Sequence, residues 1–223
     1  MPQDYNDIMK KLLLCFFLSI LVCLDVYSQN KEDMKKLLIA IFTFVAMSLS
    51  AQTWQKVSIE EANLNPFTLF QNAAALTVGN EKGMNSMTIG WGQLGVLWGG
   101  DRHVITVYVR KSRFTKHLMD ENETFTVEAF PDEYADKLQY LGTKSGRNED
   151  KIKGSGLTVK TMENGAPAFE EGKLILECRK IYDIEYPVTR MPKDIADRWY
   201  GGQEKDNPSV AYVGEITAVW VKK

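Results

Sequence analysis

Two short stretches of this 223-residue chain carry side chains that could bind a ligand with a charged end and a flat end. The first runs from Asn85 to Trp91 and places small polar groups beside a large aromatic ring. The second runs from Arg110 to Thr115 and combines cations with two hydroxyls. Between them, the residues alternate strongly in polarity from His103 to Val109, which predicts a strand. The two stretches must therefore be positioned by a sheet.

The cationic stretch suits a phosphate monoester, which carries nearly two negative charges at neutral pH. Ser112 is a preferred N-cap residue, so we expect a helix over Arg113–Asp120, whose free N–H groups and dipole would favour an anion. Arg110 or Arg113 would add a planar donor, and Thr115 a hydroxyl. Considered alone, the stretch fits a solvated strand end and an ordinary capped helix even better.

The first stretch suits a heteroaromatic ring that needs hydrogen bonds along its edge and apolar contact on its faces. Asn85, Ser86 and Thr88 could serve the edge, and Met87 or Trp91 could cover a face. The alternative is a polar turn that leads into a strand with Trp91 in the core. A ligand with a ring at one end and a phosphate at the other would need both stretches, which makes flavin mononucleotide (FMN) the first hypothesis.

Residues 1–51 are predicted to be a leader rather than part of a domain. Met9 and Met34 are each followed by two lysines and then by an apolar run that ends in small residues, as in a secretory signal peptide. Each run is shorter than the roughly 20 residues that span a bilayer. Translation from Met34 or a duplicated leader would explain two signals in series; a retained anchor and a buried helix pair are alternatives. We expect a periplasmic or secreted protein, or a cytoplasmic one if the leader is a mis-assigned start.

Residues 52–223 are predicted to form a single domain of a size that can bury a sizeable core. The formal net charge of −2 gives no reason to expect nucleic acid or an anionic membrane as a partner. Cys178 is the only cysteine in this part of the chain and alternates with core residues, so we expect it to be buried. His103 and His117 are not placed with the spacing of a metal site, and we expect none.

The mature part is predicted to be mainly β and mostly antiparallel, with a few short helices. The predicted strands are Ala73–Val78, His103–Arg110, Thr124–Phe130, Leu174–Ile184 and Val210–Val221. The predicted helices are Ser58–Asn63, Arg113–Asp120, Asp132–Leu141 and Lys193–Tyr200, and the predicted loops are Gly95–Gly100 and the cation-rich Gly142–Gly156. The last strand is partly apolar on both faces, which suits a small barrel covered on its outside by a partner.

Over nearly all of residues 67–223, the chain resembles the flavin reductase-like proteins with the FMN-binding split barrel, most closely the flavoredoxin branch. The matching motifs are Asn85-Ser86-Met87-Thr88 with Trp91, Arg110 to Thr115 followed by Asn122 to Val127, Gly142 to Gly146 with Asp150-Lys151, Leu176-Glu177-Cys178, and Gly214-Glu215-Ile216. Each motif is weak alone, but their common order is fairly specific. One departure is that the segment before Gly214 lacks the His that many relatives carry there.

The resemblance implies a Greek-key split β-barrel, a homodimer, and FMN held near the subunit interface. The residues that it implies are Asn85, Ser86, Met87 and Thr88 at the ring and ribityl chain, Arg110, Ser112 and Thr115 near the phosphate, and Ser145 and Lys151 closing from the loop. The implied activity is that of an FMN-dependent oxidoreductase or electron carrier, with use of NADH or NADPH left open. A non-catalytic flavin or planar-ligand binder and a structural domain with an empty site are the alternatives. Trp199–Gly202 is either a lid or a surface turn.

Overall fold

The computed structural model describes residues 35–36, 38–39, 53–80, 82–100, 102–205 and 207–223. The predicted leader therefore lies almost wholly outside the described residues. Thr53–Lys223 forms one compact unit. Within the described ranges, no helix is long and apolar enough to cross a membrane.

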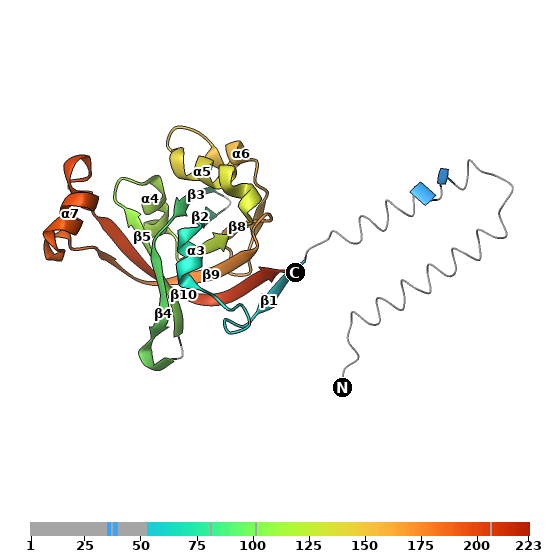
Figure 1. The fold of residues 1–223 in the computed structure, drawn as a ribbon, viewed down its shortest axis with the longest axis horizontal. Coiled ribbons are helices and arrows are strands. Elements are labelled where there is room, and N and C mark those ends of the chain that lie inside the picture. Colours follow the sequence, from blue (N-terminus) through green and yellow to red (C-terminus); the bar gives the residue numbers. More distant parts are fainter. Residues whose placement is uncertain (1–34, 37, 40–52, 81, 101, 206) are drawn as a thin grey trace. The chain divides into compact units, whose positions relative to one another are not determined.

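An antiparallel sheet of eight strands forms the body of this unit (Figure 1). Its strands are β1 (Trp54–Val57), β2 (Ala74–Asn80), β3 (Gly83–Ile89), β4 (Gly92–Leu97), β5 (Arg102–Arg110), β6 (Thr124–Ala129), β9 (Leu174–Glu185) and β10 (Ser209–Lys222). They follow the order β3-β2-β6-β9-β10-β5-β4, and β1 pairs with β10. Two short strands, β7 (Val159–Thr161) and β8 (Pro167–Phe169), pair separately.

The helices are short, and Leu69 and Phe70 of one of them belong to the core. They are α3 (Pro66–Gln71), α4 (Phe114–Glu121), α5 (Ala135–Thr143), α6 (Lys151–Ser155) and α7 (Lys193–Tyr200), with 3₁₀ turns at Trp98–Gly100, Asp132–Tyr134, Val188–Arg190 and Gly202–Glu204. Figure 1 shows α5 and α6 together at one rim, whereas α7 lies at the far end of the long β9–β10 ribbon. We call the connection between these two strands, residues 186–208, the strap.

The sheet curls into a split barrel. Strands β3 and β4 stand at opposite ends of the strand order, yet only Gly90 and Trp91 connect them, so the two ends must meet at this point. Strand β10 pairs with β9 along one edge, while its other edge is shared between β5 and β1. The prediction of a mainly β split barrel with a few short helices is confirmed.

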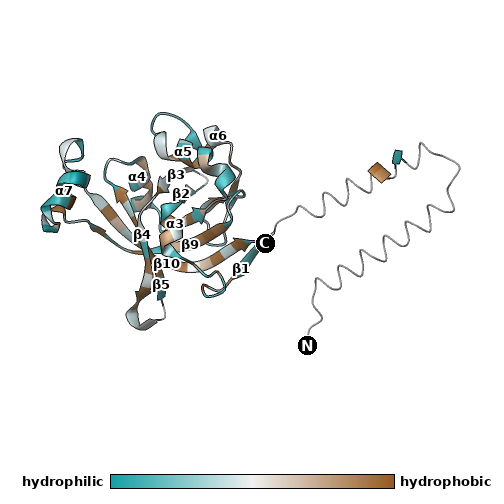
Figure 2. Cartoon of the chain, viewed as in Figure 1, coloured by the Kyte–Doolittle hydropathy of each residue, from teal (hydrophilic) through white to brown (hydrophobic). Residues whose placement is uncertain are grey.

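The core lies inside the curl, where the inward side chains of neighbouring strands meet. Leu76, Phe125, Leu176 and Tyr212 are fully buried or nearly so and belong to one cluster. Figure 2 shows the apolar residues concentrated along these strands, while α7 is mostly hydrophilic. Cys178 has no exposed surface, which confirms the core prediction, and burial raises the pKa of its thiol well above the usual value.

The predicted strands are all present with small shifts at their ends, but the sheet has two further strands near the site, β3 and β4. The loop predicted at Gly95–Gly100 is wrong, because β4 runs through Leu97 before a 3₁₀ turn. The two glycines of β4 lower its local propensity for a strand. The segment is a strand because it is hydrogen-bonded to β5 along its length. The local pattern over β3 indicates no more than a polar turn leading into a strand, although this segment is paired with β2 along its whole length.

The helix predicted at Ser58–Asn63 is also wrong. Ser58 and Glu61 make the reciprocal contacts of a capping box, but Asn63 has a φ of 47° and ends the segment after one turn. The helix follows instead at Pro66–Gln71, where Asn65 caps Phe67 and Thr68. The helix α7 agrees with its predicted range, and the predicted Asp132–Leu141 helix is split into a 3₁₀ turn and α5.

Candidate functional site

A small, strongly cationic cavity lies between β3, the start of α4 and the loop after α5. Its volume is about 100 Å³. It is lined by Asn85, Met87, Ser112, Arg113, Phe114, Thr115, Gly142, Thr143, Lys144, Ser145, Gly146, Arg147 and Lys151. Four of these residues are cations and none is a carboxylate, so the cavity is suited to an anion.

Strand β3 contributes alternate side chains to this cavity, as the pleat of a strand requires. Asn85 and Met87 line it. Ser86 and Thr88 do not: Ser86 is buried with its hydroxyl 2.9 Å from that of Thr77 on β2, and Thr88 packs against Gly142. The structure therefore brings only half of the predicted β3 residues to the cavity.

Asn85 joins the strand to both of the other walls. Its Nδ2 donates to Oγ1 of Thr115 over 2.7 Å in a buried hydrogen bond, which fixes the first turn of α4. Its Oδ1 faces Gly146, where an added Cβ would lie 2.5 Å from that oxygen and 2.7 Å from the ring of Phe114. Only a glycine allows the loop to approach this closely.

The start of α4 differs from the prediction in a way that favours an anion. The helix begins at Phe114, and its N-cap is Arg113, which makes no side-chain cap hydrogen bond. The predicted cap, Ser112, instead donates its N–H to Oδ1 of Asn207 and accepts from Nδ2 of the same residue. Because Asn207 is hydrogen-bonded to Ser112, the Ser112 hydroxyl does not cap α4. The first N–H groups of α4 therefore remain available to an anion in the cavity.

Lys151 is the most buried of the four cations, with 4% of its surface exposed. Its ammonium donates to the carbonyl oxygens of Leu141, at 2.8 Å, and Lys144, at 3.2 Å. Burial and the nearby Arg113 lower the pKa of Lys151 to about 8. An anion in the cavity would face both cations and favour the charged form of Lys151.

Lys144 and Arg147 line the cavity but were not predicted as site residues. The guanidinium of Arg147 donates to the carbonyl of Ser112 at 2.8 Å and lies 5.6 Å from the ring centre of Phe114, so it ties the loop to the start of α4. Lys144 is half-exposed beside Glu149 at 3.7 Å. The sequence feature that could have indicated them is the concentration of cations in the predicted loop Gly142–Gly156.

Arg110 is not brought to this cavity. Its guanidinium donates to Glu204 at 2.9 Å and to the carbonyl of Trp199 at 2.7 Å, and it lies 4.9 Å from the ring centre of Tyr200. All three partners belong to the strap. Arg110 therefore anchors the strap to the end of β5 and is not among the residues that line the cavity.

Trp91 lies beyond the other end of β3, in a cluster of aromatic rings. Its ring centre is 6.3 Å from that of Tyr108 and 5.7 Å from that of Trp199, and Tyr186 lies 5.1 Å from Tyr108. Trp91 is 38% exposed, so it is not the core residue of the alternative interpretation. At about 3.3 Å per residue, Asn85 and Ile89 stand roughly 13 Å apart along β3. The cationic cavity and the aromatic cluster thus mark two ends of one strand.

We predict that inorganic phosphate binds this cavity and that its affinity falls as the pH rises through about 8, where Lys151 loses its proton. The loss of one charge-assisted hydrogen bond corresponds to about tenfold in affinity. Titration calorimetry at pH 7 and pH 9.5 measures the change. In Lys151→Met the affinity should be low at both pH values, whereas Lys153→Met, an exposed neighbour on α6, should keep the wild-type profile. A wild-type affinity that does not change between the two pH values would contradict the role of Lys151.

Solved structures with this fold include several that are similar to the chain. A flavoredoxin from Methanosarcina acetivorans is 25% identical, with a TM-score of 0.53, over 68% of this chain and 68% of that one. The flavoredoxin of Desulfovibrio vulgaris is 24% identical, with a TM-score of 0.51, over 67% and 68% of the two chains. An FMN-binding protein from Thermus thermophilus with bound 1-cyclohex-2-enone is 21% identical, with a TM-score of 0.51, over 67% and 69%.

A comparison with curated protein sequences finds no match. The sequence model of the flavin reductase like domain matches residues 73–223, which is most of the chain and begins just before β2. This range contains both the cationic cavity and the aromatic cluster. The chain belongs to the family of proteins with a flavin reductase like domain.

Proposed function

We propose that this domain binds FMN, with the phosphate in the cationic cavity and the ring directed toward Trp91. The observation that carries the proposal is the composition of the cavity, which has four cations and no carboxylate among its lining residues. Family membership supports the flavin as the ligand. FMN-binding proteins among the similar structures support the same choice of cofactor.

The dimensions of the cavity support this orientation. Pockets that enclose a whole drug-sized ligand have volumes of roughly 300–1,000 Å³. A cavity of about 100 Å³ can take the phosphate end alone, so the rest of the molecule must lie outside it. Met87 continues the cavity wall along β3, in the direction of the aromatic cluster.

The residues of the chain bind and orient the cofactor, and bound FMN supplies the redox chemistry by accepting and releasing electrons. Arg113 and Lys151 would neutralise the phosphate. The N–H groups at the start of α4 would donate to its oxygens. Asn85 would hold the three walls of the cavity together, because this residue of β3 contacts both Thr115 of α4 and Gly146 of the loop.

Purified protein should show a flavin absorption spectrum, and the cavity cations should determine how tightly FMN is held. In the double variant Arg113→Gln, Lys151→Gln we expect FMN affinity to fall by at least about a hundredfold, since each charged hydrogen bond contributes about 1.5–3 kcal/mol. Equilibrium dialysis against FMN and against riboflavin measures the effect.

The control pair is Lys153→Gln with Arg190→Gln, which changes the same charge at exposed residues outside the cavity. It should bind FMN like the wild type. Riboflavin has no phosphate and should bind both double variants equally. Unchanged FMN affinity in the cavity variant, or a colourless protein that fails to take up FMN, would overturn the proposal.

The second part of the proposal concerns the source of electrons. The predicted leader would export the domain from the compartment that holds NADH and NADPH, so we propose that a protein or a quinone-linked partner exchanges electrons with bound FMN. In this role the domain is an oxidoreductase whose acceptor and donor are both outside the cytosol.

We expect NADH and NADPH to reduce the FMN-loaded protein at less than about 1 s⁻¹, the lower end of ordinary enzyme turnover. A soluble quinol should reduce it faster under the same anaerobic conditions. Stopped-flow absorbance records both reactions, and dithionite defines full reduction. Rapid oxidation of NADH or NADPH would contradict the proposed donor, and reduction by dithionite alone would identify a non-catalytic binder.

The last part of the proposal is a homodimer. Tyr182 and Ile184 occupy alternate positions on β9, so they share one face of the strand, and both are about half exposed. Apolar surface of this kind favours contact with a second copy. We predict that Ile184→Glu converts the protein to a monomer, measured by light scattering after gel filtration, whereas Asp183→Lys on the opposite face does not. A monomeric wild type, or a dimeric Ile184→Glu, would contradict this arrangement.

A further inference from the structure

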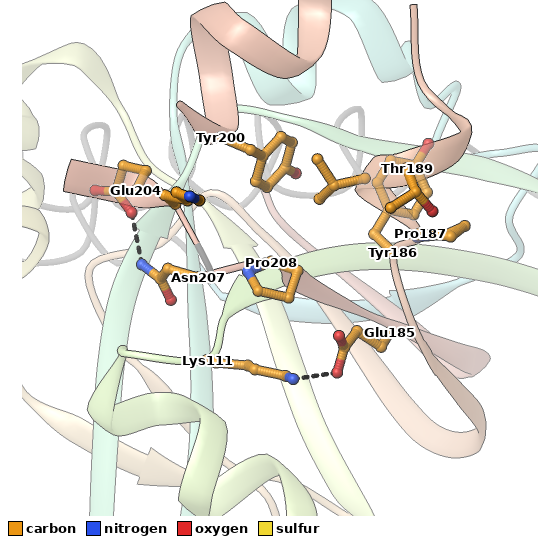
Figure 3. A pocket seen from close by; sticks show the side chains of 11 residues that line it. Lys111, Glu185, Tyr186, Pro187, Thr189, Tyr200, Glu204, Asn207 and Pro208 are labelled. Carbon is orange, nitrogen blue, oxygen red and sulfur yellow. Dashed lines mark hydrogen bonds and ion pairs between the residues drawn. The ribbon is translucent and has the colours of Figure 1, made fainter. Parts of the chain in front are cut away.

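A second, larger cavity lies under the strap and is separate from the cationic cavity. Its volume is about 460 Å³, within the range of pockets that hold small organic ligands. It is lined by Lys111, Glu185, Tyr186, Pro187, Val188, Thr189, Tyr200, Glu204, Lys205, Asn207 and Pro208. Figure 3 shows Tyr200 and Thr189 on one side of the space and the Lys111–Glu185 ion pair on the opposite side.

The side formed by the strap is aromatic and apolar, and its rings are fixed. Tyr200 is 7% exposed, its hydroxyl donates to Ser209 at 3.2 Å, and Arg110 covers one face of its ring. Tyr186 is held against Tyr108. Pro187 and Val188 complete this wall. Rings that are already immobilised offer a flat surface at little entropic cost, which favours a planar ligand.

The charges of the cavity leave one cation without a partner. Glu185 is neutralised by Lys111, and Glu204 accepts from Arg110 and Asn207. Lys205 makes no side-chain hydrogen bond or ion pair with any residue that the structure describes, although its backbone N–H is bonded to Gly202. Arg110 does not line the cavity but neutralises Glu204, so together with it these groups carry one excess positive charge, which favours a ligand with a single negative charge.

We propose that this cavity is a binding site for a small planar aromatic anion, with the ring against Tyr200 and Val188 and the acidic group toward Lys205. Hydrogen bonds between Asn207 and Ser112 link the two cavities. Asn207 lines the strap cavity and holds Ser112 by two hydrogen bonds, and Ser112 lines the cationic cavity. A ligand under the strap would thus lie next to the site proposed for FMN, but its binding rests on the geometry of the strap alone and does not require FMN.

The test uses the full chain and 2-naphthoate as the probe, with titration calorimetry as the readout. We expect saturable binding that weakens by about fivefold in Lys205→Gln and by at least about tenfold in Val188→Trp, which fills the cavity. Lys193→Gln is the matched control, because Lys193 is an exposed lysine of the same strap that does not line the cavity. It should bind 2-naphthoate like the wild type.

Two further measurements separate the possible outcomes. 2-Naphthylmethylamine has a similar ring with the opposite charge and should bind at least about tenfold more weakly than 2-naphthoate. Phosphate and FMN affinities, measured on the same variants, should stay at the wild-type values. If the wild type binds 2-naphthoate but not FMN, the FMN proposal has failed and this inference has not. Equal affinity for acid and amine, or unchanged 2-naphthoate binding in both Lys205→Gln and Val188→Trp, would overturn the inference. Because Lys205 is exposed, its variant remains informative even if Val188→Trp does not fold.

Discussion

The long strand β10 is the constraint on which the rest of the domain depends. It pairs with β9 along nearly its whole length, while its other edge pairs first with β5 and then with β1. An irregularity in its pairing with β9 lies between Ile216 and Ala218, in the interval where it leaves one neighbour and joins the next. Such bulges bend a strand and increase its twist. A curled sheet with a split edge follows from this change of neighbours.

The curl makes the functional region possible because it brings together segments that are distant in the chain. The loop after α5, the start of α4 and strand β3 meet around one cavity, and the strap meets the end of β5. Ser112 joins these parts: Asn207 of the strap binds its N–H and hydroxyl, and Arg147 of the loop binds its carbonyl. The strap and the loop after α5 are therefore attached to the same short piece of backbone.

The electrostatics of the domain are local rather than global. The chain as a whole has a formal net charge of −2, yet four cations line one small cavity without a carboxylate. Holding Lys151 in a buried position costs free energy, as its lowered pKa indicates. A fold keeps such an arrangement when something else offsets the cost, and a bound phosphate group would do so for Lys151 and Arg113 together.

The mainly β architecture could be predicted from the sequence, because alternation along β5, β6, β9 and β10 is a property of neighbouring residues. Local residue chemistry placed Asn85, Met87, Ser112, Arg113 and Thr115 among the candidates, the family resemblance added Ser145 and Lys151, and all of these line the cavity. The sequence did not predict that Arg110 turns to the strap or that Ser112 is bound by Asn207 rather than capping α4, because both contacts depend on tertiary structure. The partners of Arg110 and Ser112 lie about 90 residues away in the chain. A pattern of neighbouring residues contains no information about such distant contacts, so it predicts only the local alternative, a capped helix.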